Sequence, residues 1–173
     1  MKKLSILICT MIALSGFMAT TVRAGSPHFI KGPTLVYDAS TGDLCASFKE
    51  AGLGNTPITY TITAAEETFT FQCFTKSNNT PQGDPNGVSV SNASNTTTIT
   101  PHNGQITGTL CLTPCQGGSC QGGGLVLKLI AASYTGPITF CDSTDGVCVT
   151  VEGSFGGSLT APIKASTLPP CTP

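Results

Sequence analysis

Short apolar stretches alternate with polar residues along most of the chain, and turn residues interrupt them about every ten positions. The clearest alternation runs from Ile58 to Ala64, where apolar side chains point one way and threonines point the other. This period of two is typical of a strand with one buried face. No segment longer than a few residues has helical periodicity, so the pattern predicts an all-β protein.

Further strands are expected wherever β-branched and aromatic residues recur. Residues 125–133 are almost continuously apolar, which indicates a central strand buried on both faces. Residues 75–87 and 113–124 are rich in Asn, Gly, Pro and Ser and are expected to be loops. We therefore predict an antiparallel, immunoglobulin-like β-sandwich of about eight or nine strands, although the Cys–Trp–Cys pattern of true immunoglobulin domains is missing. The other expected strands are 34–37, 44–48, 69–73, 88–91, 96–100, 105–112, 138–141 and 147–151.

The first 24 residues have the features of a secretory signal peptide. Two lysines follow Met1, an apolar run continues to Met18, and small residues precede Gly25. The apolar run is shorter than the roughly 20 residues that span a bilayer. Cleavage near Ala24 would leave 25–173 as one secreted or periplasmic β-sandwich domain without a transmembrane segment; an uncleaved N-terminal anchor is the alternative.

Loss of this leader changes the charge balance. The whole chain has eight Lys plus Arg and nine Asp plus Glu, and Lys2, Lys3 and Arg23 lie in the leader. The remainder has five lysines and no arginine. Because nucleic-acid binding depends on basic patches and on arginine, the sequence argues against a nucleic-acid partner.

Cysteines are frequent and even in number once the leader is removed. Of nine, only Cys9 lies in the leader. Eight cysteines in an exported chain indicate up to four disulfides. The close spacing of Cys111, Cys115 and Cys120 offers zinc binding as an alternative, but an oxidising destination favours disulfides.

The hairpin around residues 142–147 decides one pairing. A four-residue turn, 143–146, sets Cys141 opposite Cys148 and allows a disulfide. A two-residue turn at 145–146 instead sets Cys148 opposite Ser143 and points the two cysteines to opposite faces. The first register is favoured. The other expectations are a Cys73–Cys120 disulfide and open partners for Cys45, Cys111, Cys115 and Cys171.

Several motifs are familiar. The "KEAGLGN" stretch within 48–56, the Phe-Gln-Cys strand at 71–73 and the Asp-Ser-Thr-Asp-Gly-Val hairpin at 142–147 resemble a group of small secreted bacterial proteins of unassigned function. The apolar strand 125–135, which ends in Ser-Tyr-Thr after a cysteine, also resembles that group. The resemblance covers most of the chain after the leader and marks structure; it implies no activity. This chain has more cysteines than the group.

Candidate catalytic residues are few. His28 and His102 are the only histidines, and neither lies in a motif for nucleophilic catalysis. Glu66 and Glu67 are adjacent and point to opposite sides of an extended chain, so they do not form a glycosidase pair. We predict no catalytic, cofactor or metal site.

Two further polar patterns have structural interpretations. Asp142 and Asp145 lie in one turn, where Asp is favoured for its hydrogen bonds to the backbone; a weak Ca²⁺ site is the alternative. Glycosylation sequons begin at Asn78, Asn92 and Asn95. Because the short Lys-Lys leader indicates a bacterial host, we interpret them as polar loop residues.

Three functions follow as hypotheses. The leading one is a secreted or surface protein that is not an enzyme and binds an extracellular glycan or protein through the 75–87 and 113–124 loops. The second is a hydrolase that uses Glu50, Glu152 or His102. The third is a disulfide-stabilised inhibitor or toxin acting through the glycine-rich segment 117–124.

Overall fold

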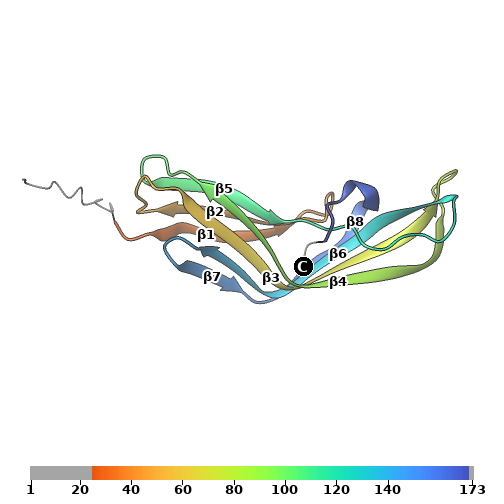
Figure 1. Ribbon diagram of the computed structural model, residues 1–173. Coiled ribbons are helices and arrows are strands. Elements are labelled where there is room, and N and C mark those ends of the chain that lie inside the picture. Colours follow the sequence, from red (N-terminus) through yellow and green to blue (C-terminus); the bar gives the residue numbers. More distant parts are fainter. Residues whose placement is uncertain (1–24, 172–173) are drawn as a thin grey trace, which may run out of the picture.

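The computed structural model describes residues 25–171, which form antiparallel strands and one short 3₁₀ helix (Figure 1). This confirms the predicted all-β antiparallel class. No helix in this part of the chain is long and apolar enough to cross a membrane. The elements in chain order are β1 (His28–Tyr37), β2 (Leu44–Ala51), β3 (Ile58–Thr75), β4 (Pro81–Ile99), β5 (Gln105–Leu112), β6 (Leu125–Asp142), β7 (Val147–Val151), β8 (Ser154–Lys164) and the helix η1 (Ala165–Thr167).

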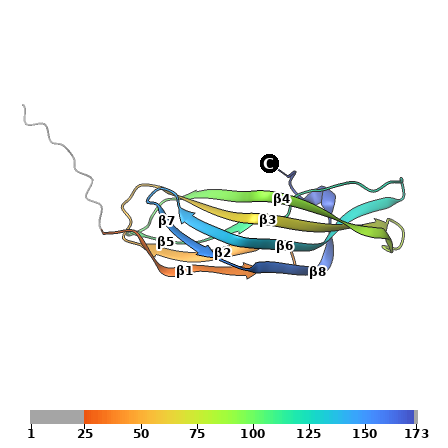
Figure 2. The same ribbon diagram turned by 90° about the horizontal axis from the view of Figure 1, so that it is seen from below.

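The strands form two sheets of unequal length. Sheet A has the order β1-β2-β5, and sheet B has the order β4-β3-β6-β7, with β8 also paired to β6. β8 pairs with the first part of β6 and β7 with its last part. Sheet A lies over only the half of sheet B that holds β7, as Figures 1 and 2 show from two directions.

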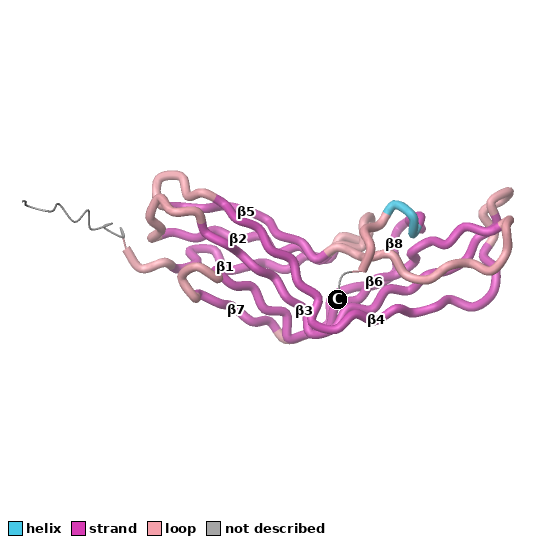
Figure 3. The backbone as a smooth tube through the Cα atoms, viewed as in Figure 1, coloured by secondary structure: helices cyan, strands magenta, loops and turns pink. Residues whose placement is uncertain are grey.

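The long strands of sheet B pass through both halves of the molecule and bend near its middle (Figure 3). Here the register between β3 and β6 shifts between Ala64 and Glu66. One extra residue in a strand reverses which side chains face inward. Ala64 is therefore buried before the bend, and Glu67 and Phe69 are buried after it.

The half covered by sheet A has an aromatic core. Phe48 of sheet A contacts Tyr60 and Phe140 of sheet B, with ring centroids 4.4 and 4.7 Å apart. Phe29 of β1 completes the cluster at 5.7 Å from Phe140. Each large ring removes much apolar surface from water, so this cluster is a main source of stability.

The other half of sheet B is covered by loop and tail. Phe69 and Tyr134 pack edge to face on its inner surface, with centroids 6.1 Å apart. The 113–124 loop lies close: a Cβ at Gly117 would come within 2.5 Å of a Val88 methyl. Helix η1 contributes the buried Ala165. In this half of the molecule, the 113–124 loop and the C-terminal segment therefore cover the inner face of sheet B, which sheet A covers in the other half.

The predicted loop at 75–87 is too long. β3 continues to Thr75 and β4 begins at Pro81, and the expected strands 88–91 and 96–100 are parts of this one strand. Residues 81–87 are polar because β4 is an edge strand and both its faces are exposed there. Proline is tolerated at an edge, so polar composition suggested a loop where the chain is extended.

Strand β8 was not predicted at all. Its segment contains two adjacent glycines and a proline, which weaken the β signal. A Cβ at Gly156 would lie 2.3 Å from the Ala132 carbonyl oxygen, so glycine is required for β8 to approach β6.

The apolar run of β6 is central, as predicted, but its outer face is less covered than expected. Leu129 and Ala132 are fully buried, whereas Val126, Ile130 and Ala131 are half-buried. The prediction that both faces of this segment are buried is therefore wrong, because no second layer of residues 25–171 covers the outside of sheet B.

Candidate functional site

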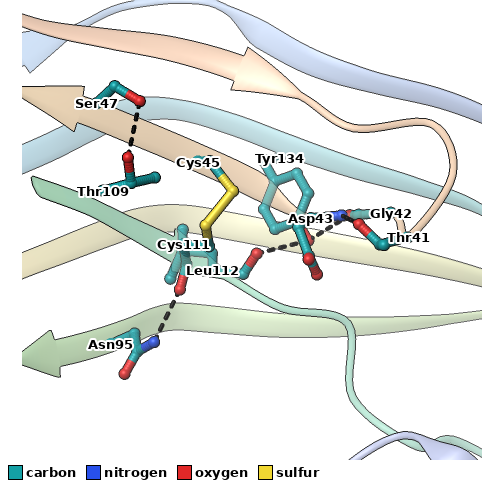
Figure 4. The surroundings of a disulfide bond; sticks show 10 residues. All are labelled: Thr41, Gly42, Asp43, Cys45, Ser47, Asn95, Thr109, Cys111, Leu112 and Tyr134. Atoms are coloured by element: carbon teal, nitrogen blue, oxygen red, sulfur yellow. Dashed lines mark hydrogen bonds between the residues drawn. A yellow bond between two sulfur atoms is a disulfide. The ribbon is translucent and has the colours of Figure 1, made fainter.

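Two disulfides join strands that are neighbours in a sheet. Cys45 of β2 is bonded to Cys111 of β5, directly opposite it, with Cα atoms 4.0 Å apart (Figure 4). Cys141 of β6 is bonded to Cys148 of β7 at 4.1 Å. Asp142 pairs with Val147, so the hairpin has the four-residue turn 143–146 and not the two-residue turn 145–146.

The other two disulfides attach irregular segments to the strands. Cys73–Cys120 fixes the 113–124 loop on β3, and Cys115–Cys171 fixes the C-terminal tail on that loop. Every cysteine among the described residues is therefore in a disulfide, and no zinc-binding thiolate cluster exists among them.

The residues considered for hydrolysis are scattered. His102 lies in the turn before β5, and Glu152 is exposed beyond β7. Glu50 is completely buried between the sheets and accepts a hydrogen bond from the Tyr60 hydroxyl at 2.7 Å. His28 is exposed and bonds the Ser26 backbone oxygen. The structure does not assemble them into one catalytic site.

The aspartates of the β6–β7 turn have a local role. The Asp142 side chain is fully buried, and its Oδ1 accepts hydrogen bonds from the backbone N–H groups of Thr144 and Asp145. No cluster of His, Cys, Asp or Glu in residues 25–171 is arranged to hold a metal ion. Asp142 therefore caps its own turn, as Asp does in an Asx turn.

Glu66 and Glu67 do point to opposite sides, and the bend of β3 decides which is buried. Glu66 is exposed, whereas Glu67 is only 4% exposed. Its Oε1 atom is buried and has no hydrogen-bond partner. Burial raises the pKa of Glu67 from an ordinary 4.5 to about 7. A carboxyl that titrates near neutral pH beside a cavity is a candidate functional group.

The Glu67 carboxyl lies at a pocket of about 310 Å³, which we call the Glu67 pocket. Its walls come from β4, the end of β5, the 113–124 loop and the C-terminal tail. The remaining lining residues are Val90, Ala93, Ser94, Asn95, Leu112, Thr113, Cys115, Pro169 and Pro170.

Two polar side chains near this pocket are already engaged. The Asn95 amide donates to the Cys111 carbonyl oxygen at 2.8 Å, which links the adjacent edges of the two sheets (Figure 4). The Tyr134 hydroxyl donates to the Gly42 carbonyl oxygen at 2.7 Å. Neither bond involves Glu67, so the Glu67 carboxyl is left to the pocket.

A second hollow, at the end of sheet B farthest from β1, gathers positive charge. We call it the lysine hollow; its volume is about 430 Å³. Its described lining contains three of the five lysines of residues 25–171 and no carboxylate. The lining residues are Thr75, Lys76, Asn79, Val126, Lys128, Lys164 and Ser166.

Among residues 25–171, no carboxylate pairs with the lysines of this hollow. Lys76 Nζ donates to the Gly123 carbonyl oxygen at 3.1 Å, and Lys128 Nζ donates to Asn79 Oδ1 at 2.5 Å. Lys128 and Lys164 lie directly opposite each other on β6 and β8. Like charges at directly opposed positions destabilise a sheet, so stability does not account for this arrangement.

The sequence alone predicts neither the Glu67 pocket nor the lysine hollow. Lys76, Lys128 and Lys164 are far apart along the chain, and only the pairing of β8 with β6 and the β3–β4 turn bring them together. In the sequence, Glu67 is distinguished only as one of two adjacent glutamates. The signal for it is the reversal of the buried positions across Ala64–Phe69, which indicates a bulge with a carboxylate on the inner face.

Fold and site together define a disulfide-crosslinked, all-β protein with an acidic pocket at its middle and a cationic hollow at one end. A scan against protein-family models finds no match, and searches of the curated proteins and of the solved structures find none either.

Proposed function

We propose that this chain is an exported, non-enzymatic binding protein whose lysine hollow takes an anionic extracellular glycan. In this proposal residues 1–24 are a cleaved signal peptide, the host is bacterial, and the two sheets form an immunoglobulin-like sandwich. The Lys-Lys leader, the four disulfides and the resemblance of the "KEAGLGN" stretch support export from a bacterium.

The observation that carries the proposal is the concentration of lysines that pair with no carboxylate among the described residues. Three ammonium groups around one hollow repel one another, and no carboxylate of the hollow neutralises them. A bound anion removes this repulsion and gains hydrogen bonds from the ammonium groups. The Thr75 and Ser166 side chains in the same lining add hydroxyl groups of the kind that bind sugars and carboxylates.

The position of the hollow favours a large ligand. It opens at the end of sheet B, beside the β3–β4 turn and the glycine-rich part of the 113–124 loop, as the Lys76–Gly123 bond shows. Function commonly lies on loops at the end of a rigid β scaffold. A polymer with repeated negative charge can follow such an end without entering the core.

Binding to immobilised polygalacturonate, with neutral dextran as the reference polymer, tests this function. The triple variant Lys76→Gln, Lys128→Gln, Lys164→Gln is expected to bind at least about tenfold more weakly, because charge-assisted bonds contribute about 1.5–3 kcal/mol each. Binding should also weaken steeply with added salt.

The matched control is the double variant Lys31→Gln, Lys49→Gln, which removes the two lysines that pair across β1 and β2 outside the hollow. It should keep most of the affinity. Equal losses in both variants would indicate general charge attraction and contradict the site, and no binding of polygalacturonate by the unmodified protein would contradict an anionic glycan as the ligand.

A further inference from the structure

The Glu67 pocket contains a carboxyl group that has neither a hydrogen-bond donor nor a positive charge beside it among the described residues. Glu67 is 4% exposed, one of its oxygens is buried without a partner, and the carboxyl meets the pocket. Burying a carboxyl without hydrogen bonds costs stability. The other buried glutamate, Glu50, also has one oxygen without a partner, but its Oε2 accepts a hydrogen bond from Tyr60, and Glu67 has no such bond.

Residues 25–171 do not supply a positive charge for this carboxyl. The five lysines after the leader are accounted for: three line the lysine hollow, and Lys31 and Lys49 pair across β1 and β2. None of them lines the Glu67 pocket. A cation that pairs with the ionised Glu67 carboxylate would therefore have to come from a ligand.

The chemistry of the lining narrows the class of cation. Calcium and magnesium require several oxygen ligands, and Glu67 is the only carboxylate among the described residues that line the pocket. Val90, Leu112 and Pro169 instead offer an apolar wall, and Ser94 and Thr113 add hydroxyl groups. A small apolar stem with one charged donor matches a pocket that combines an apolar wall with a single acid.

We propose that the Glu67 pocket binds a primary ammonium group on a short apolar stem. The ammonium group donates to the Glu67 carboxylate, and the stem packs against Val90, Leu112 and Pro169. The site is separate from the lysine hollow and has the opposite charge preference. The same chemistry is available from a free alkylamine and from a lysine side chain of a partner protein.

Titration of the ¹⁵N- and methyl-labelled protein at pH 8, followed by NMR, tests the proposal. Glu67 is mainly ionised there, since its pKa is about 7, and an alkylamine is still protonated. n-Butylamine should shift the Val90 and Leu112 methyl signals and bind about tenfold or more tightly than 1-butanol, which has the same stem without the charge.

A second arm identifies the source of the ammonium group. Nα-acetyl-lysine amide has the same butyl stem joined to a peptide backbone. If it binds as tightly as n-butylamine, the pocket accepts a lysine side chain of a partner; if only n-butylamine binds, the pocket takes a free amine. Both outcomes support the ammonium site.

Glu67→Gln keeps the shape and removes the charge, and it should lose the preference for n-butylamine over 1-butanol. Glu66→Gln, one residue away on the exposed face, is the matched control and should keep it. Equal affinity of the unmodified protein for amine and alcohol would overturn the proposal even if Glu67→Gln does not fold, and so would an unchanged preference in a folded Glu67→Gln.

Discussion

At the scale of single residues, two buried glutamates show how partners determine the consequence of burial. Burial raises the pKa of Glu50, but the Tyr60 hydroxyl bond counteracts part of this effect. Glu67 has no such bond, and burial alone raises its pKa to about 7. Glu67 is therefore the residue whose protonation should be visible in the stability of the protein.

Stability should depend on pH through Glu67. Because its folded pKa is raised from 4.5 to about 7, the folded state holds this proton more tightly than the unfolded state. The stabilisation is complete below pH 4.5 and is lost as pH rises through 7; at about 1.4 kcal/mol per pKa unit the whole effect is about 3 kcal/mol. The free energy of unfolding, measured in urea from pH 4 to pH 8, should fall across this window.

The comparison that isolates Glu67 is with Glu67→Gln, in which this part of the pH dependence should disappear. Glu66→Gln should retain the slope of the unmodified protein. If Glu67→Gln loses stability between pH 4.5 and 7 as steeply as the unmodified protein, another group is responsible.

The alternation of side chains predicted that Glu66 and Glu67 point to opposite sides, and they do. Which of them faces inward was not predictable, because it depends on the register shift between β3 and β6. A pairing between distant strands leaves little trace in the local sequence.

At the scale of elements, strands with one buried face were predictable and strands without one were not. Ile58–Ala64 and Gln105–Leu112 alternate clearly and lie where expected. The first part of β4 is exposed on both faces, and β8 needs glycine for its approach to β6, so neither has an alternating pattern. An alternating pattern indicates a strand with one buried face. The first part of β4 and β8 are strands because of their pairing with β3 and β6, and this pairing leaves no such pattern.

Two of the disulfides make a matched pair for measuring the effect of loop length. Cys45–Cys111 and Cys141–Cys148 both join opposed residues of neighbouring strands, at sequence separations of 66 and 7. Loop entropy in the unfolded chain grows with the logarithm of this separation. Replacing Cys45 and Cys111 by alanine should therefore lower the free energy of unfolding by about 2 kcal/mol more than replacing Cys141 and Cys148.

Chemical denaturation of the two double variants checks this difference. The variant without Cys141–Cys148 is the control, because it also loses a disulfide between directly opposed strand residues, but one that closes a much shorter loop. Equal destabilisation would mean that the disulfides act mainly on the folded state and not on the entropy of the unfolded chain.

At the scale of the whole molecule, one sheet covers only half of the other, and the 113–124 loop and the tail cover the rest. The sequence predicted a sandwich but not this division, since irregular segments carry no periodic pattern. The two candidate sites follow from the division: the Glu67 pocket lies where loop, tail and strands meet, and the lysine hollow lies beyond the reach of sheet A.

All eight cysteines of residues 25–171 are paired, so the protein without residues 1–24 should contain no free thiol. Alkylation without reduction should leave its intact mass unchanged. Reduction should lower the midpoint of thermal unfolding while far-ultraviolet circular dichroism retains the β signal, because both halves have apolar cores. Alkylated cysteines before reduction, or loss of the β signal on reduction alone, would contradict this picture.

The length of β3 has a practical consequence for attaching the protein to a surface. Its 18 residues extend over about 60 Å. The first described residues lie near one end of the molecule, and the β3–β4 turn, whose Lys76 and Asn79 line the lysine hollow, lies at the other end (Figures 1 and 2). A bead, dye or display anchor joined before Gly25 would thus be held away from the hollow by the body of the protein. A tether before Gly25 leaves the end with the lysine hollow exposed to ligands. Single-molecule or display formats should therefore attach the protein before Gly25.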